Sequence, residues 1–190
     1  MDQERQLAAK IGSECLQGTG AGSSPTIGLR NLAGTTQTEV DAGSGNGGLP
    51  GLVDILDAMD RLERDNASPS AIFMHPRTWA TFRKLDDLQE RLQLQPDPTQ
   101  DASRRLFGLP VFVSSQISIT ETYGNNSDTS YIVVADMSQV VLGVRTQNTV
   151  LYDPFTYGST GQIQVIATSR VAFNVLATEA VEIIEGVRTS

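Results

Sequence analysis

Residues 131–136 (YIVVAD) begin with five consecutive apolar side chains, and this run limits the possible folds more than any other feature of the chain. Successive side chains of a strand point to opposite faces, so a strand formed by this run must be covered on both faces. The run therefore predicts a buried central strand. Residues 71–74 (AIFM) predict a second, shorter buried strand. Residues 139–172 alternate apolar and polar side chains, which predicts long, half-exposed strands.

Three segments have the spacing of amphipathic helices. Residues 3–16 repeat apolar side chains every three to four positions, and residues 52–65 carry the clearest apolar stripe. A third helix is expected to begin at Pro76, because proline fits the first turn of a helix. Helices and strands do not alternate strictly along the chain, so the expected fold class is α+β with a mixed sheet. The residues predicted to form the apolar sides of the second and third helices are Leu52, Ile55, Leu56, Met59, Leu62, Trp79, Phe82 and Leu85.

The other segments are rich in glycine, serine and asparagine. Residues 17–51 are expected to be mainly loop, with a weak strand at 35–40. Residues 117–130 (ISITETYGNNSDTS) are polar and rich in turn-forming residues, so they are expected to be an exposed loop. A length of 190 residues favours one domain or two small interleaved lobes.

Charge and cysteine content exclude several classes of protein. The net charge is −8 and the pI is about 4.6, without the basic excess that a nucleic-acid-binding groove requires. Cys15 is the only cysteine, so the chain can form neither an internal disulfide nor a cysteine-based zinc site. No apolar run approaches the ~18 residues that span a bilayer, and residues 1–10 lack the features of a secretion signal. A cytosolic origin is expected.

His75 is the only histidine and the first candidate for a catalytic residue. A metal site with two histidines is excluded, but a nucleophile–histidine–carboxylate arrangement stays open because sequence does not show which residues meet in space. No G-x-S-x-G motif surrounds any serine. The position of His75, between a predicted strand and Pro76, favours a structural role in which the side chain faces solvent or caps the helix.

The remaining candidates have simpler structural interpretations. Residues 18–25 (GTGAGSSP) follow a predicted helix and contain no lysine, unlike a phosphate-binding loop. Cys15 lies on the apolar side of a predicted helix, which favours a buried, inert thiol. The sequence therefore indicates no catalytic, cofactor-binding or metal-binding residue. The acidic residues interpreted as solvated are Asp54, Asp57, Asp60, Asp86, Asp87 and Asp97.

The order of several segments resembles the major capsid protein of tailed bacteriophages, whose shell fold is shared with encapsulins. Each segment alone is weakly specific, but the ordered set covers nearly the whole chain. One departure is His75, which stands where the family commonly has asparagine. The segments are LQGTGAGSSPTIGL (16–29), AIFMHPRTWATFRKLDD (71–87), LFGLPVFVSSQI (106–117), YIVVADMSQVVLGVRTQNTVLYDP (131–154) and IQVIATSRVAFNVLATEAVEII (163–184).

The resemblance implies two lobes. An axial lobe, with a mixed central sheet flanked by helices, would comprise residues 21–138 and 173–190. A partial peripheral lobe, with the end of the family's spine helix and long strands, would comprise residues 1–20 and 139–172. The family's N-terminal arm, its extended loop and the first part of the spine helix have no counterpart here. The chain is therefore expected to be the C-terminal portion of such a protein, monomeric or weakly associated by itself.

The resemblance also implies a non-enzymatic function. The chain would be a structural subunit of a phage or prophage capsid, assembling in the host bacterial cytoplasm into hexamers and pentamers that enclose double-stranded DNA in the virion. Its main partner would be itself, through loops 114–130 and 153–161, and a scaffold protein is a further candidate. Sequence-specific nucleic-acid binding and membrane association are not expected. Two alternatives are an encapsulin-like shell subunit and an α+β hydrolase that uses His75.

Some relatives of this family crosslink their subunits through a lysine, an asparagine and a glutamate. The asparagine position falls near Gly161 or Gln162 of this chain, and the glutamate position near Thr168. The loop that carries the lysine has no counterpart. No isopeptide chemistry is therefore expected, and no catalytic residue is carried over from the family.

Overall fold

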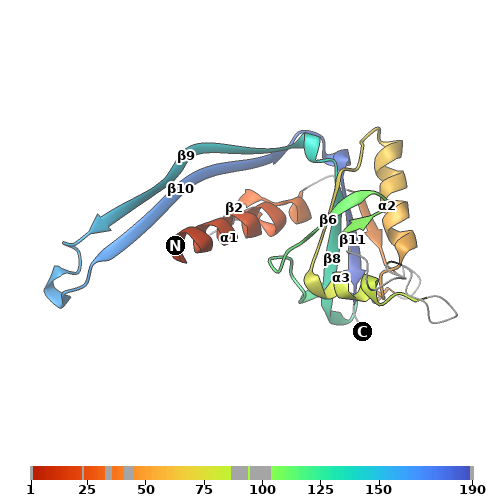
Figure 1. Ribbon diagram of the computed structural model, residues 1–190, viewed down its shortest axis with the longest axis horizontal. Coiled ribbons are helices and arrows are strands. Elements are labelled where there is room, and N and C mark those ends of the chain that lie inside the picture. Colours follow the sequence, from red (N-terminus) through yellow and green to blue (C-terminus); the bar gives the residue numbers. More distant parts are fainter. Residues whose placement is uncertain are drawn as a thin grey trace.

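The computed structural model describes residues 2–22, 24–32, 36–40, 45–86, 94 and 104–188. Figure 1 shows a body built around a sheet, a long two-stranded arm that extends from it, and a helix beside the arm. Both the strong helix at 52–65 and the long strands after residue 139 are confirmed. The elements are α1 (Asp2–Gln17), β1 (Thr19–Ala21), β2 (Ser24–Ile27), η1 (Leu29–Asn31), β3 (Thr36–Glu39), α2 (Leu52–Arg64), β4 (Ala71–Met74), α3 (Pro76–Arg83), β5 (Arg105–Leu106), β6 (Leu109–Val113), β7 (Glu121–Tyr123), β8 (Asn126–Ala135), η2 (Met137–Gln139), β9 (Val140–Asp153), η3 (Gly158–Thr160), β10 (Gln164–Val175), η4 (Thr178–Ala180) and β11 (Val181–Val187).

The body contains a mixed sheet with the strand order β3-β11-β8-β4-β6-β5, and β7 pairs with β8. β11 runs parallel to β3 and antiparallel to β8, while β4 runs parallel to β6 and antiparallel to β8. The strand at 131–136 lies near the middle of this order, as its continuous apolar run predicts. The expected α+β class with a mixed sheet is confirmed.

The side chains of β8 alternate between two cores, one on each face of the sheet. Ile132 and Val134 are fully buried on the face covered by α2, whereas Tyr131, Val133 and Ala135 are buried on the opposite face. This alternation explains why the run tolerates no polar side chain between its ends. The helical residues that complete the first core are Ile55, Ala58, Leu62 and Phe82, and those that pack into the second core are Leu16 and Leu29.

Helix α1 and the segment that follows it are tied to the sheet-centred body. Asn31 donates hydrogen bonds from Nδ2 to the carbonyl oxygens of Gln17 and Gly18, both at 3.0 Å, and these bonds cap the end of α1. Arg30 then pairs with Glu185 of β11 at 2.5 Å and lies over the ring of Tyr131, 5.3 Å from its centroid. These contacts fasten α1 to the body. Leu16 of α1 and Phe173 of β10 pack against the same core, so α1 lies at the base of the arm.

Two segments expected to be loops are hairpins instead. The expectation of an exposed loop at 117–130 is wrong, because β7 and the first half of β8 pair there. Thr129 and Ser130 are buried, and their hydroxyls donate to the carbonyls of Glu121 and Ser118, both at 2.7 Å. β1 and β2 likewise form an antiparallel pair in the first loop region.

The apolar stripe of α2 is also displaced from the expected one. Leu56 was expected on the buried side of the helix, but it is 44% exposed. Ala58, at the centre of the buried side, takes its place with an exposure of 0%. The small side chain at this position lets the helix lie close to the sheet.

Candidate assembly surfaces

The arm exposes apolar side chains along most of its length. β9 and β10 pair from Val140 and Val175 at the base to Asp153 and Gln164 at the far end, and no third strand joins them among the described residues. An isolated two-stranded ribbon is marginally stable in water, and large exposed apolar patches usually mark interaction sites. The arm therefore has the properties of a surface that another chain covers. Its exposed apolar residues are Val141, Leu142, Val144, Val150, Leu151 and Tyr152.

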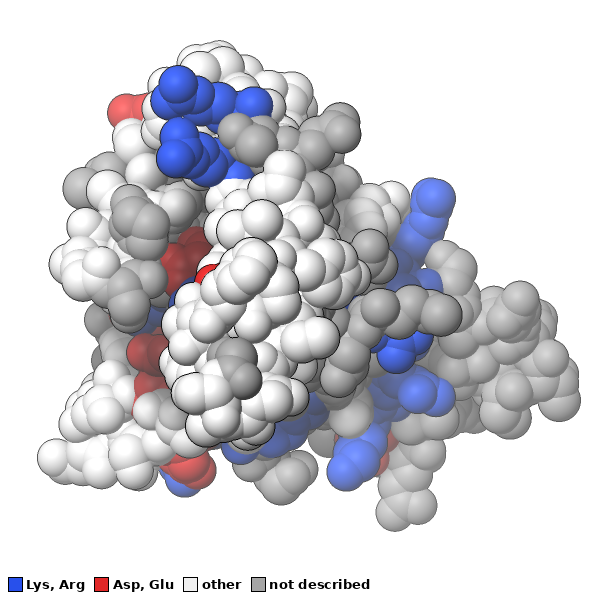
Figure 2. Space-filling view, turned by 90° about the vertical axis from the view of Figure 1, so that its left-hand side faces the viewer, with Lys and Arg blue, Asp and Glu red and all other residues white. Residues whose placement is uncertain are grey.

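The far half of the arm is almost without charge. Residues 146–169 contain one charged side chain, Asp153. Figure 2 views the molecule from the tip end of the arm, and most of the described atoms nearest the viewer are uncharged, with basic and acidic side chains lying around them. Phe155, at the tip, is 88% exposed. A tip with a single charged side chain and an exposed aromatic ring is suited to apolar contact with a partner.

Asp153 fixes the shape of the tip. Its Oδ1 accepts hydrogen bonds from the amides of Phe155, at 2.9 Å, and Thr156, at 3.3 Å, and its Oδ2 accepts one from the Thr156 hydroxyl. The Thr156 hydroxyl, followed by the Phe155 amide, lowers the pKa of the Asp153 carboxyl below its ordinary value. The carboxylate thus holds the turn that presents Phe155.

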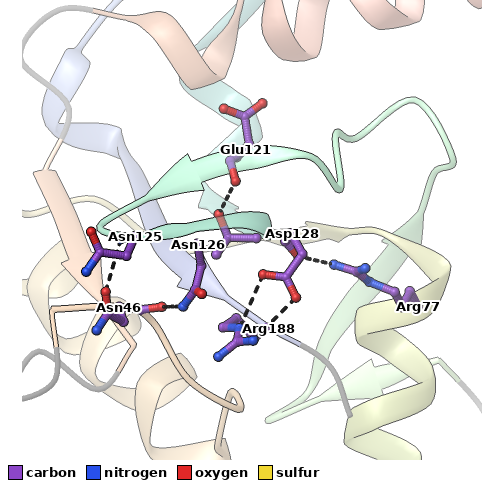
Figure 3. Close-up of polar contacts among 8 residues, drawn as sticks. Asn46, Arg77, Glu121, Asn125, Asn126, Asp128 and Arg188 are labelled. Carbon is purple, nitrogen blue, oxygen red and sulfur yellow. Dashed lines mark hydrogen bonds and ion pairs between the residues drawn. The ribbon is translucent and has the colours of Figure 1, made fainter.

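A second surface lies at the β7–β8 hairpin, where four segments of the chain meet (Figure 3). The Asn46 side-chain oxygen accepts from the Asn125 amide at 3.0 Å, and the Asn126 side chain donates to the Asn46 carbonyl at 2.7 Å. Arg77 and Arg188 both point toward Asp128. Arg77 donates to its carbonyl at 2.8 Å, and Arg188 lies 3.4 Å from its carboxylate. The hairpin is therefore attached to α3, to the end of β11 and to residues 45–48.

Close contact between glycines makes this attachment possible. A Cβ atom added to Gly124 would lie 2.2 Å from the Gly45 carbonyl oxygen, and one added to Gly47 would lie 2.2 Å from that of Gly186. No side chain fits at either distance, and both positions have positive φ angles. Residues 45–48, within a glycine-rich stretch, thus have a definite packing role that their composition alone did not reveal.

His75 caps helix α3, which is one of the two structural roles expected for it. Its Nδ1 accepts a hydrogen bond from the Arg77 amide at 3.0 Å. Burial, and secondly the charge of Arg77, lower the pKa of the imidazole below its ordinary value. No carboxylate or hydroxyl of the described residues hydrogen-bonds to this ring, so the arrangement that a hydrolase would need is not found in that part of the chain.

The other sequence candidates lie apart from one another. Cys15 is half-buried on α1, and burial, followed by the charge of Glu14, raises the pKa of its thiol, which disfavours the reactive thiolate. The Asp54 carboxylate accepts from the Gly51 amide at 2.7 Å at the start of α2. Asp60 pairs with Arg64.

Asp57 and Asp86 are exposed, while Asp87 and Asp97 lie outside the described residues. Within the described ranges, no group of three or more His, Cys, Asp or Glu side chains is arranged to hold a metal ion. A helix able to cross a bilayer is not found among those residues either.

The positions suggested by crosslinking relatives lie on the arm. Gly161 follows η3 at the tip, and Thr168 lies on β10, where its hydroxyl is 2.7 Å from that of Thr149. None of the residues near these positions in sequence is the asparagine or glutamate of the family pattern. The arrangement at Thr168 is a cross-strand hydroxyl pair of the ordinary kind.

Comparison with known proteins assigns the fold. Residues 2–186 match the model of the Phage capsid family. One similar solved structure is the capsid of a native GTA particle, with 18% sequence identity and a TM-score of 0.70 over 97% of this chain and 66% of that chain. Another is the structure of Gordonia phage Cozz, with 15% identity and a TM-score of 0.71 over 97% of this chain and 60% of that chain. The holo-SrpI encapsulin complex from Synechococcus elongatus is also similar, with 15% identity and a TM-score of 0.60 over 100% of this chain and 67% of that chain. The chain thus spans between 60% and 67% of the length of these three structures. No curated protein matches it.

Proposed function

The chain belongs to the phage capsid family, and from this premise we propose that it is a structural subunit of an icosahedral phage or prophage capsid. Copies of the chain assemble into hexamers and pentamers that enclose double-stranded DNA. The observation that carries the proposal is the arm, whose exposed apolar side chains have no covering within the described part of the chain. Shell proteins need large surfaces that identical copies can cover for one another.

The proposed subunit has two lobes. The axial lobe comprises residues 21–138 and 173–190, and the peripheral lobe comprises residues 1–20 and 139–172. Two observations support the division: the sheet with its two cores lies in the first set, and the arm with α1 lies in the second. β10 continues to Val175, so it links the two lobes.

Two segments are proposed as contact regions. The segment 114–130, which contains the anchored β7–β8 hairpin, would face the axis of the hexamer or pentamer. The segment 153–161 would meet neighbouring capsomers through Phe155, because this ring is 88% exposed on a turn held by Asp153. The proposed partners are copies of the chain and a scaffold protein. A net charge of −8 argues against a tight, sequence-specific grip on the enclosed DNA.

The proposed location is the virion, after assembly in the host bacterial cytoplasm, and no catalytic, cofactor-binding or metal-binding residue is assigned. An encapsulin-like shell is the second candidate, because the chain shares its fold over its whole length with an encapsulin. The contents of the particle distinguish the two. A capsid holds nuclease-protected double-stranded DNA, whereas an encapsulin-like shell holds protein.

The test is to express the protein from its complete reading frame in bacteria and to analyse particles by sedimentation and electron microscopy. Closed shells are expected. Phe155→Ser should leave small rings but few closed shells, because the contact between capsomers is weakened, while Ser159→Ala in the same exposed loop should assemble normally. If the unaltered protein yields only monomers under conditions where it is folded, the proposed function is wrong.

A further inference from the structure

The helix side of the sheet presents an exposed apolar stripe with acidic surroundings. Val53 and Leu56 are 65% and 44% exposed and lie three positions apart on the outer side of α2, and Leu49, in the segment that leads into the helix, is 59% exposed. Asp57 adjoins them and forms no ion pair among the described residues. We call these four residues the α2 stripe. Figure 1 shows α2 at the outer edge of the body, away from the arm.

The basic residues of α2 do not offset this acidity. Arg61 lies 3.6 Å from the buried carboxylate of Glu182 on β11, and Arg64 pairs with Asp60. Both cations are therefore already next to carboxylates of the same chain. The outer side of α2 is left with a negative local field beside exposed apolar side chains.

The opposite side of the sheet presents an apolar patch with a positive charge. Phe112 pairs with Phe73 in the sheet and is 51% exposed, and their rings stack with centroids 5.3 Å apart. Arg105, on the edge strand β5, alternates with the buried Leu106, so its side chain lies on the same side as Phe112. With Phe107, these residues form the Phe112 patch.

Phe107 adds an unusual backbone conformation to this patch. Its φ angle is +50° and that of Gly108 is +83°, the combination for which a two-residue hairpin turn strongly favours asparagine followed by glycine. A phenylalanine in the left-handed region is rare. The ring is nevertheless 45% exposed, so burial within the subunit does not compensate for the strain. A partner that covers the ring would explain why phenylalanine occupies this turn.

We propose that the α2 stripe of one copy packs against the Phe112 patch of the next copy and so builds the capsomer ring. The surfaces are complementary, since each combines exposed apolar side chains with a charge opposite to that of the other. They lie on opposite sides of one sheet, so the contact runs head to tail and can close into a ring. This inference rests on the proposed function and identifies the faces that meet within a capsomer.

Charge reversal tests the pairing in the protein expressed from its complete reading frame. Asp57→Arg and Arg105→Asp should each lower the yield of assembled particles about fivefold or more, because each places like charges across the contact. The double variant should recover a yield within about twofold of the unaltered protein. Glu179→Arg is the matched control, because this exposed residue of η4 belongs to neither surface and should not change the yield.

The outcomes separate this inference from the proposed function. Failure of the unaltered protein to assemble would count against the proposed function itself. If the unaltered protein assembles, the pairing is wrong in any of three cases: the single variants assemble normally, the double variant recovers nothing, or the control is as defective as they are.

Cysteine crosslinking gives a second measurement for the case in which a charge variant does not fold. Val53→Cys and Phe112→Cys are placed on separate copies that also carry Cys15→Ser, and the copies are mixed before oxidation. A disulfide between the two different copies is expected. Disulfides formed only between identical copies, or none at all in assembled particles, would overturn the inference.

Discussion

Gly124→Ala should destabilise the chain more than a glycine-to-alanine change at a position that has a similar φ angle but open space around it. Gly124 has a φ angle of +59°, and the added methyl would lie 2.2 Å from the Gly45 carbonyl oxygen and 2.7 Å from Asn46 Oδ1. Gly22 is the matched control, with a φ angle of +61° and no atom within 4 Å of an added Cβ. Both variants incur the left-handed penalty of roughly 1–2 kcal/mol.

The additional cost of Gly124→Ala comes from the network around Asn46. Relieving the overlap moves residues 45–46 away from the hairpin and breaks the two hydrogen bonds to Asn125 and Asn126, each contributing about 1 kcal/mol. The expected losses of unfolding free energy are about 3–4 kcal/mol for Gly124→Ala and about 1–2 kcal/mol for Gly22→Ala. At ~3 °C per kcal/mol, the melting temperatures fall by about 10 °C and about 4 °C.

Urea unfolding followed by circular dichroism and by the fluorescence of Trp79, the only tryptophan, measures both losses. Hydrogen exchange of the hairpin amides then shows whether the damage is local. If the two variants lose the same free energy to within about 0.5 kcal/mol, the glycine contact does not hold the hairpin and the reasoning is refuted.

Three further predictions concern single side chains. His75→Ala should lower the free energy of unfolding by about 1 kcal/mol at pH 7.5 because the helix cap is lost, whereas His75→Asn should change it little. The pKa of His75 is lowered in the folded state, so the stabilisation by the neutral imidazole is complete above the ordinary histidine pKa and is lost as the pH falls through the folded-state pKa. Urea unfolding at pH 5 should therefore show a smaller difference between His75→Ala and the unaltered chain. Asp153→Ala should speed hydrogen exchange at the amides of Phe155 and Thr156 without changing the melting temperature. In the unaltered chain, exchange at these amides should speed up only as the pH falls through the lowered pKa of Asp153. Unchanged exchange in the variant would contradict the role of Asp153 in holding the turn. Phe107→Asn should raise the free energy of unfolding by roughly 1 kcal/mol, because asparagine tolerates the left-handed region, and should reduce the yield of assembled particles. A lower free energy of unfolding in urea would contradict the strain assigned to this turn.

The elements predicted from the sequence are those with strong patterns. The run at 131–136 predicts a central strand and nothing else, because no polar residue interrupts its apolar side chains and a strand formed by them must be covered on both faces. The β7–β8 hairpin was missed for the opposite reason. Thr129 and Ser130 look solvated in sequence, but their hydroxyls are satisfied by carbonyls of the neighbouring segment, which a linear pattern does not reveal.

The contacts of the hairpin could not be predicted from sequence either. Asn46 meets Asn125 and Asn126 across 79 and 80 residues of chain, and Arg188 meets Asp128 across 60. No local spacing carries such information, and each of these residues alone suggests only a polar surface. The left-handed Phe107 was similarly hidden, since the Phe-Gly pair is not the usual signal for this turn.

The attachment of the arm at one end only has a mechanical consequence. β9 has 14 residues, which corresponds to a lever of about 45 Å at roughly 3.3 Å per residue. A rotation of about 5° at the base displaces the far end of such a lever by about 4 Å. Chemically identical chains can thus meet neighbours at unequal angles through bending at the base, while the packing inside each sheet-centred body stays as it is.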